Sequence, residues 1–114
     1  MELPAGDYIG MHRDEIDTPV LLVDLDALDY NIEKMAAHFC KAGKHLRPHS
    51  KSHKTPAIAH LQLNAGALGI TCAKLGEAEV MANAGIRDIL IANEVVGPRK
   101  IERLMHLATR CDIM

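Results

Sequence analysis

Apolar residues along the chain follow two patterns, one typical of buried strands and one typical of helices with a single apolar face. A continuous run of Val and Leu predicts a buried strand over residues 20–24. Over residues 27–41 the apolar positions recur at spacings of three and four, which predicts an amphipathic helix with Asp26 as its N-terminal cap. Gly43 is expected to end this helix, because glycine adopts the left-handed conformation beyond a helix without strain.

The same alternation continues to the end of the sequence. Further helices are predicted over residues 55–64, from about Glu77 to 84 and from Pro98, and further strands over residues 69–72, 88–92 and 111–114. An Ala-Gly pair follows three of the helices, at residues 42–43, 65–66 and 84–85. Short strands and helices that alternate at this spacing require parallel pairing with right-handed crossovers, so the predicted fold class is α/β.

Two architectures with parallel sheets have this alternation of strands and helices. A doubly wound sheet normally has a glycine-rich phosphate turn after its first strand, whereas residues 24–26 here are Asp-Leu-Asp. The regular βα units favour a partial (β/α)8 barrel, truncated after about three to four units. Because a complete barrel needs roughly 250 residues, the chain is expected to be a fragment of a longer protein or a half-barrel that must pair. Residues 1–17 are predicted to be an irregular lead-in and residues 18–114 the incomplete barrel.

Composition excludes several classes of protein. A net charge of −2, one Phe, two Tyr and no Trp argue against a nucleic-acid partner. The N-terminus shows neither a signal peptide nor an apolar run long enough for a membrane span, so a cytoplasmic location is expected. Cys40, Cys72 and Cys111 are odd in number and widely spaced, which predicts buried apolar residues and neither disulfides nor a zinc-binding pair.

The chemistry is concentrated in residues 47–54, Arg-Pro-His-Ser-Lys-Ser-His-Lys, within an interval from Glu33 to Glu77 that contains no other acidic residue. A strand that begins near His45 is expected to lead into this segment, and the carboxyl ends of barrel strands form the catalytic mouth. A lysine there can form a Schiff base with an aldehyde. Neighbouring positive charges favour the neutral, nucleophilic amine, and they would also suit a phosphorylated cofactor.

Three other interpretations of this segment stay open. Its lysines can be solvated loop charges, as most lysines are, with histidines that cap helices. His45, His49 and His53 recur every four residues and can be a metal site, although Pro48 opposes one continuous helix through them and no HExxH motif is present. The third interpretation is a non-catalytic basic fragment that binds phosphate or nucleic acid.

Two further residues are candidates for cofactor contacts. His49 would share a face with Lys51 in an extended segment, where it could line the cofactor, orient the lysine or only pack in the loop. Asn93 follows the predicted strand 88–92 and is therefore expected at the same mouth, or it caps the loop before Pro98.

The segment 46–54 closely resembles the RPHxKxHK segment of the D-threonine aldolase and D-serine dehydratase family, which are pyridoxal-phosphate (PLP) enzymes of the alanine racemase-like fold. Weaker similarities occur at residues 17–19, 69–79 and 92–98, so the resemblance covers about residues 16–105. It implies a barrel of the alanine racemase N-terminal type and a strand 20–24 that belongs to a second, β-rich domain.

In this family the first lysine of the segment carries the cofactor, so the resemblance places the Schiff base with PLP on Lys51 and makes Lys54 a supporting charge. The family also has a divalent metal site in its C-terminal domain. The resemblance therefore implies metal ligands beyond Met114, no metal site in this fragment, and a homodimer when full length.

The implied function is a PLP-dependent lyase that acts on D-3-hydroxy amino acids. A D-threonine aldolase-like enzyme, which residues 93–97 favour, would cleave its substrate to glycine and an aldehyde. The alternative is a D-serine dehydratase-like enzyme, which would release a keto acid and ammonia. The 114-residue fragment alone is expected to be inactive.

Overall fold

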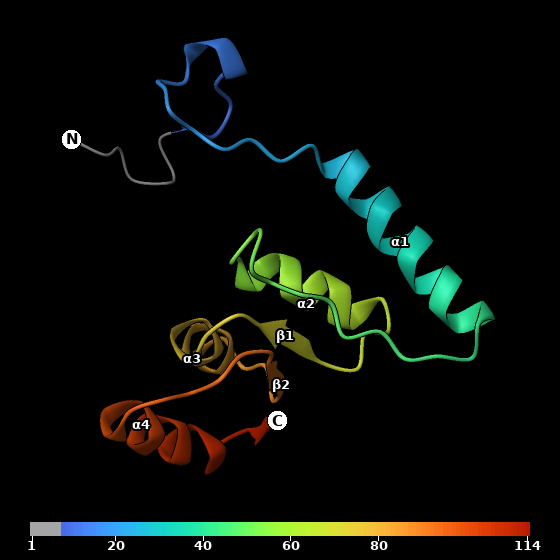
Figure 1. The fold of residues 1–114 in the computed structure, drawn as a ribbon. Coiled ribbons are helices and arrows are strands. Elements are labelled where there is room, and N and C mark those ends of the chain that lie inside the picture. The colour runs from blue at the N-terminus through green and yellow to red at the C-terminus, as the bar shows by residue number, and fades with distance from the viewer. Residues whose placement is uncertain (1–7) are drawn as a thin grey trace.

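The computed structural model describes residues 8–114, in which helices and short strands alternate (Figure 1). The elements after the short 3-10 helix Arg13–Glu15 are α1 (Leu25–Lys41), α2 (Pro56–Asn64), β1 (Ile70–Cys72), α3 (Leu75–Asn83), β2 (Asp88–Ile91), α4 (Pro98–Ala108) and β3 (Asp112–Ile113). The strands and helices predicted after residue 54 are therefore confirmed in type and order. The predicted lead-in falls partly on residues 1–7, which lie outside the described residues.

The sheet is parallel throughout, with strand order β1-β2-β3. The predicted strand that ends at His49 is present as an extended edge segment, which bridges in parallel to Thr71 of β1. Two of the backbone hydrogen bonds that hold it run from Leu68 N to Leu46 O and from Thr71 N to Pro48 O, each 2.8 Å long. A parallel sheet whose strands are joined through helices is the structure expected for part of a βα barrel.

Helix α3 lies at the centre of the core, between α2 and α4 and against the sheet (Figure 1). It contributes Leu75, Ala78, Met81 and Ala82 to the buried apolar cluster. The strands contribute the fully buried Ile70, Cys72 and Ile89, as expected for a sheet covered by helices. Other buried apolar residues are Ala59, Ile86, Ile91, Leu107 and Cys111.

The prediction of a buried strand over residues 20–24 is wrong. Residues 20–23 are irregular and exposed, and Leu21 is 95% exposed. A continuous apolar run predicts burial, but a strand also needs a neighbour for its backbone hydrogen bonds, and none is present among residues 8–114. The cap of α1 is Asp24, whose Oδ1 accepts the Ala27 N–H at 2.9 Å, so Asp26 lies in the first turn of the helix instead.

Helix α1 stands apart from the sheet, as Figure 1 shows. It has the predicted apolar face, but none of its residues is buried. The face lines a cavity of about 920 Å³ together with residues 43–49 and the end of α2. Cys40 lies on this helix and is exposed, in contrast to the predicted burial of all three cysteines, whereas Cys72 and Cys111 are buried.

Two smaller differences concern the helix starts. Helix α3 begins at Leu75, two residues before the predicted start at Glu77. Thr55 occupies the N-cap position of α2, but its Oγ1 donates to the carbonyl of His53 at 2.7 Å and makes no cap hydrogen bond. None of the helices within residues 8–114 combines the length and apolar character that crossing a membrane requires.

The amino edge of the sheet contains an ion pair across three neighbouring segments. The guanidinium of Arg47 donates to the carboxylate of Asp88, the first residue of β2, and both side chains are largely covered. Gly69 lies between them: a Cβ there would meet the backbone carbonyl of Asp88 and would lie 2.6 Å from both Arg47 Nη1 and Asp88 Oδ1. A residue without a side chain is therefore required immediately before β1, where the ion pair passes.

We expect the substitution Gly69→Ala to lower the free energy of unfolding by about 1–3 kcal/mol, because the added methyl group must displace the ion pair or the backbone. Urea denaturation measures this change. The control is Gly76→Ala in α3, where a Cβ meets nothing within 4 Å and no loss is expected. Equal effects of the two substitutions would contradict the proposed close contact.

A second ion pair joins α3 to α4. Arg103 Nε donates to Glu79 Oε1 at 2.9 Å, and this hydrogen bond holds the pKa of Glu79 below its ordinary value of 4.5. A lowered carboxyl pKa stabilises the fold above that ordinary value, and the stabilisation is lost as the pH falls through the lowered pKa. We therefore expect Arg103→Met to destabilise the protein at pH 7, with a difference from the parent protein that shrinks at acidic pH below 4.5.

Thermal denaturation across this pH range tests the expectation. Arg99→Met is the control, because Arg99 is an exposed arginine of the same helix. A difference between the Arg103→Met and parent proteins that stays constant with pH would show that Glu79 does not account for it.

Candidate active site

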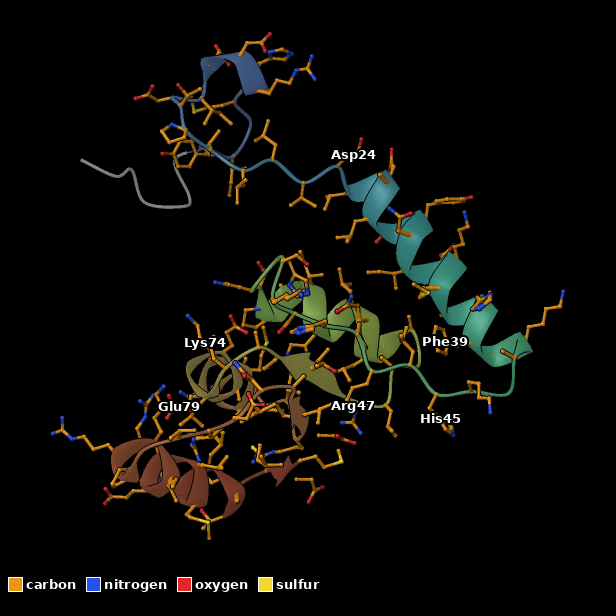
Figure 2. All side chains as sticks on the ribbon, in the orientation of Figure 1. Asp24, Phe39, His45, Arg47, Lys74 and Glu79 are labelled. Carbon is orange, nitrogen blue, oxygen red and sulfur yellow. The ribbon has the colours of Figure 1, made fainter. Side chains whose placement is uncertain are left out.

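The residues that could take part in a reaction lie at the carboxyl edge of the sheet. In a parallel sheet all strands end at the same edge, so the residues that follow His49, β1 and β2 are neighbours there. Figure 2 shows Lys74 at this edge, whereas His45 and Arg47 lie at the opposite, amino edge. Lys51 follows His49 by two residues and is exposed. The predicted position of Lys51 at the end of a strand is therefore matched by the fold.

A tight turn over residues 50–54 carries Lys51. Ser50 is fully buried, and both its backbone N–H, at 2.8 Å, and its Oγ, at 3.1 Å, donate to the carbonyl of Thr71. At the other end, the N–H of Lys54 donates to the carbonyl of Ser50 at 2.8 Å. The backbone of Lys51 is thus closed into a turn, while the residue is exposed.

One histidine before the turn and one within it make the same kind of hydrogen bond. Lys51 N–H donates to His49 Nδ1 at 3.3 Å, and Thr55 N–H donates to His53 Nδ1 at 3.0 Å. An Nδ1 that accepts a hydrogen bond leaves the proton of the neutral ring on Nε2. Burial lowers the pKa of His53, which favours this neutral form.

His53 also has a buried and unused atom. Its Nε2 and the Oε1 of Gln62 are both buried, and neither makes a hydrogen bond of full geometry in the described part of the chain, although the nearby Gln62 side chain raises the pKa of His53 in partial opposition to burial. Since the ring proton is on Nε2, His53 can offer a donor on the side of helix α2, and Gln62 can offer an acceptor. His49 therefore bonds to the Lys51 backbone, whereas His53 bonds to the backbone of Thr55, the N-cap residue of α2.

Glu77 is the site residue that the sequence did not single out. It lies at the third position of α3, only 8% exposed, where its Oε2 accepts the Ala73 N–H at 2.7 Å. Its Oε1 lies 3.6 Å from the Nζ of Lys54. From the sequence, Glu77 was expected only as the start of a helix. Its position at N3 of the helix could have indicated a further role, because a Glu side chain at N3 can reach back to the residues before the helix.

Cys72 is a core residue, as expected. It is fully buried, its Sγ lies 3.6 Å from Ser50 Oγ, and burial raises the pKa of its thiol. A buried thiol with a raised pKa is a poor nucleophile. Cys72 therefore packs against Ser50 in the turn that carries Lys51, and it contributes no reactive group.

Asn93 connects the loops after β1 and β2. Its Nδ2 donates to the carbonyl of Ala73 at 3.2 Å, and its Oδ1 accepts the N–H of Glu94 at 2.9 Å. Asn93 is thus at the predicted edge of the sheet, but both polar ends of its amide are engaged within the chain. Its predicted contact with a cofactor stays a prediction.

The geometry does not support the metal interpretation of the three histidines. His45 lies at the amino edge of the sheet, whereas His49 and His53 lie before and within the turn at the other edge. Among residues 8–114 there is no group of three or more His, Cys, Asp or Glu side chains arranged to hold a metal ion.

Comparisons with known proteins agree with the fold. The family model for the N-terminal domain of alanine racemase matches residues 23–113. Among curated proteins, the chain is 48% identical over 106 residues to a D-threonine aldolase of an Arthrobacter species, and 46% identical over 99 residues to the 3-hydroxy-D-aspartate aldolase of Paracoccus denitrificans. These alignments cover 93% and 86% of this chain but 28% and 26% of the relatives, so the chain spans about a quarter of their length.

Solved structures show the same similarity. The D-threonine aldolase of Filomicrobium marinum superposes with a TM-score of 0.83 at 52% identity, over 85% of this chain and 26% of that one. The D-threo-3-hydroxyaspartate dehydratase of Delftia sp. HT23 superposes with a TM-score of 0.80 at 39% identity, over 87% of this chain and 26% of that one. Since the family model matches most of the 114 residues, the chain belongs to the family of alanine racemase N-terminal domains.

Proposed function

We propose that the chain is the N-terminal part of a PLP-dependent lyase for D-3-hydroxy amino acids, and that Lys51 holds the cofactor covalently. The observation that carries this proposal is the exposed amine of Lys51 on a hydrogen-bonded turn at the carboxyl edge of the parallel sheet. The aldolases and the dehydratase with which the chain aligns supply the reaction class. Residues 18–114 are the proposed barrel segment.

The surroundings of Lys51 fit a carbonyl cofactor. No carboxylate of residues 8–114 forms an ion pair with Lys51, so no such contact has to be broken when its amine reacts. When bound, PLP supplies an electron sink for the charge that develops at the α-carbon of an amino acid. The described residues supply the amine and the rigid turn that presents it.

His49 is the stronger of the two further candidates for cofactor contact. Its Nδ1 is used by the Lys51 backbone, which orients the ring and leaves the Nε2–H available as a donor close to the lysine. The amide of Asn93 is already paired with Ala73 and Glu94. Asn93 would therefore act by holding the loops after β1 and β2 together more than by binding the cofactor.

An aldolase activity is favoured over a dehydratase activity. The chain is 46–48% identical to the two aldolases and 39% identical to the dehydratase of Delftia sp. HT23 over similar lengths. One matched structure of that dehydratase, a variant, is described as metal-free. We propose that a divalent metal assists the reaction here too, with ligands outside residues 8–114, and that the full-length protein is a homodimer.

The first test is covalent labelling. Full-length protein is incubated with PLP, reduced with borohydride and mapped by mass spectrometry, and we expect a phosphopyridoxyl group on Lys51. Lys51→Ala should remove this label and lower kcat by at least about 100-fold, the scale of a lost catalytic group. The control Lys44→Ala removes an exposed lysine of the same acid-free interval and should change neither. A label on no lysine, or spread over surface lysines, would refute the assignment.

The second test identifies the reaction. Full-length protein with PLP and a divalent metal is given D-threonine or D-threo-3-hydroxyaspartate, with L-threonine as the control that should not react. We expect glycine and an aldehyde as products. Ammonia and a keto acid would instead establish the dehydratase reaction, and the absence of all four products would refute the proposed lyase.

A further inference from the structure

The turn that carries Lys51 contains a second lysine that could compete for the same aldehyde. Lys51 and Lys54 are three residues apart, both are exposed, and both lie at the carboxyl edge of the sheet. The resemblance in sequence favours Lys51, but it gives no physical reason for the choice. The structure offers one, and the argument rests on the function proposed above.

The two lysines differ in their contacts. The Nζ of Lys54 lies 3.6 Å from Glu77 Oε1, and the side chain of Glu77 is only 8% exposed. The other carboxylate oxygen of Glu77 is fixed by the Ala73 N–H at 2.7 Å, so the carboxylate has a defined position at the start of α3. Lys51 forms no ion pair with the described carboxylates.

Lys54 also has an unusual backbone conformation. Lys54 has a φ of +49°, the only positive φ of a non-glycine residue among residues 8–114. Such a conformation is uncommon outside glycine and persists where surrounding contacts hold it. Here the Lys54 N–H bond to Ser50 O closes the turn, and the ion pair with Glu77 holds the side chain.

We propose that Glu77 is a positioning residue that selects Lys51 over Lys54 as the lysine that binds the aldehyde of PLP. In the selected step the neutral amine of Lys51 adds to the aldehyde carbon. The carbonyl oxygen then leaves as water with the two amine protons, and a C=N bond remains. For Lys54 to react in the same way, its ammonium must lose a proton and move away from Glu77. That movement would leave a buried carboxylate without its countercharge, which is unfavourable.

The test is the distribution of the borohydride-trapped label in the full-length protein. Glu77→Gln keeps an oxygen that can accept the Ala73 N–H but removes the charge beside Lys54. We expect the ratio of label on Lys54 to label on Lys51 to rise about two- to fivefold, the scale of one ion pair whose lysine side chain is 58% exposed. In the double variant Glu77→Gln, Lys54→Arg the competing amine is absent, so the label should return to Lys51 alone.

A matched control separates selection from a general loss of structure. Glu79 lies in the same helix and is also ion-paired, to Arg103, but not to the turn. Glu79→Gln should therefore leave the label ratio unchanged. An unchanged ratio in Glu77→Gln, or an equal change in Glu79→Gln, would overturn the role of Glu77.

A second measurement needs no variant and no cofactor. Trace acetylation of the cofactor-free parent protein, read by mass spectrometry, should modify Lys54 about two- to fivefold more slowly than Lys51, because only the amine of Lys54 must leave an ion pair to react. Equal rates would overturn the selection even if Glu77→Gln failed to fold. If the parent protein instead shows no label on Lys51 after reduction with PLP, the proposed function fails, and this outcome is distinct from the two that concern Glu77.

Discussion

The hydrogen bonds of Thr71 hold the candidate site to the sheet. This buried residue of β1 accepts the N–H and the Oγ of Ser50 at its carbonyl, donates its own N–H to Pro48 O, and donates its Oγ1 to Arg47 O at 3.1 Å. Four hydrogen bonds from one residue fix the register of the edge segment. A shift of one residue would turn every side chain of that segment to the other face, so the position of Lys51 depends on this register.

The same register joins the two edges of the sheet. At the amino edge, Gly69 leaves room for Arg47 to reach Asp88, so the segment that leads to Lys51 is also tied to β2. At the carboxyl edge, the turn closes onto the start of α3 through Glu77. A lysine side chain is flexible and gains little from its own contacts. The position of its amine must therefore be set by a backbone that is fixed at both edges of the sheet.

Much of the architecture could be predicted because it follows from local patterns. The apolar spacing and the Ala-Gly ends located α2, α4 and the three strands, and the motif at residues 46–54 located the candidate lysine. The error at residues 20–24 has a physical origin: local apolar character predicts a strand, but pairing is a nonlocal property. Glu77 was missed for the same reason, since a helix start is brought beside the preceding βα turn only by parallel pairing of the strands.

This pairing also changes the meaning of the acid-free interval from residues 34 to 76. The sequence offers no acidic residue within the interval that could form an ion pair with any of its lysines. In the fold, the first acidic residue after the interval lies against Lys54 and not against Lys51. The interval therefore contains two electrostatically different lysines three residues apart. A charge count along the chain treats them alike, whereas the carboxylate supplied by the next βα unit makes one a paired structural charge and leaves the other available for chemistry.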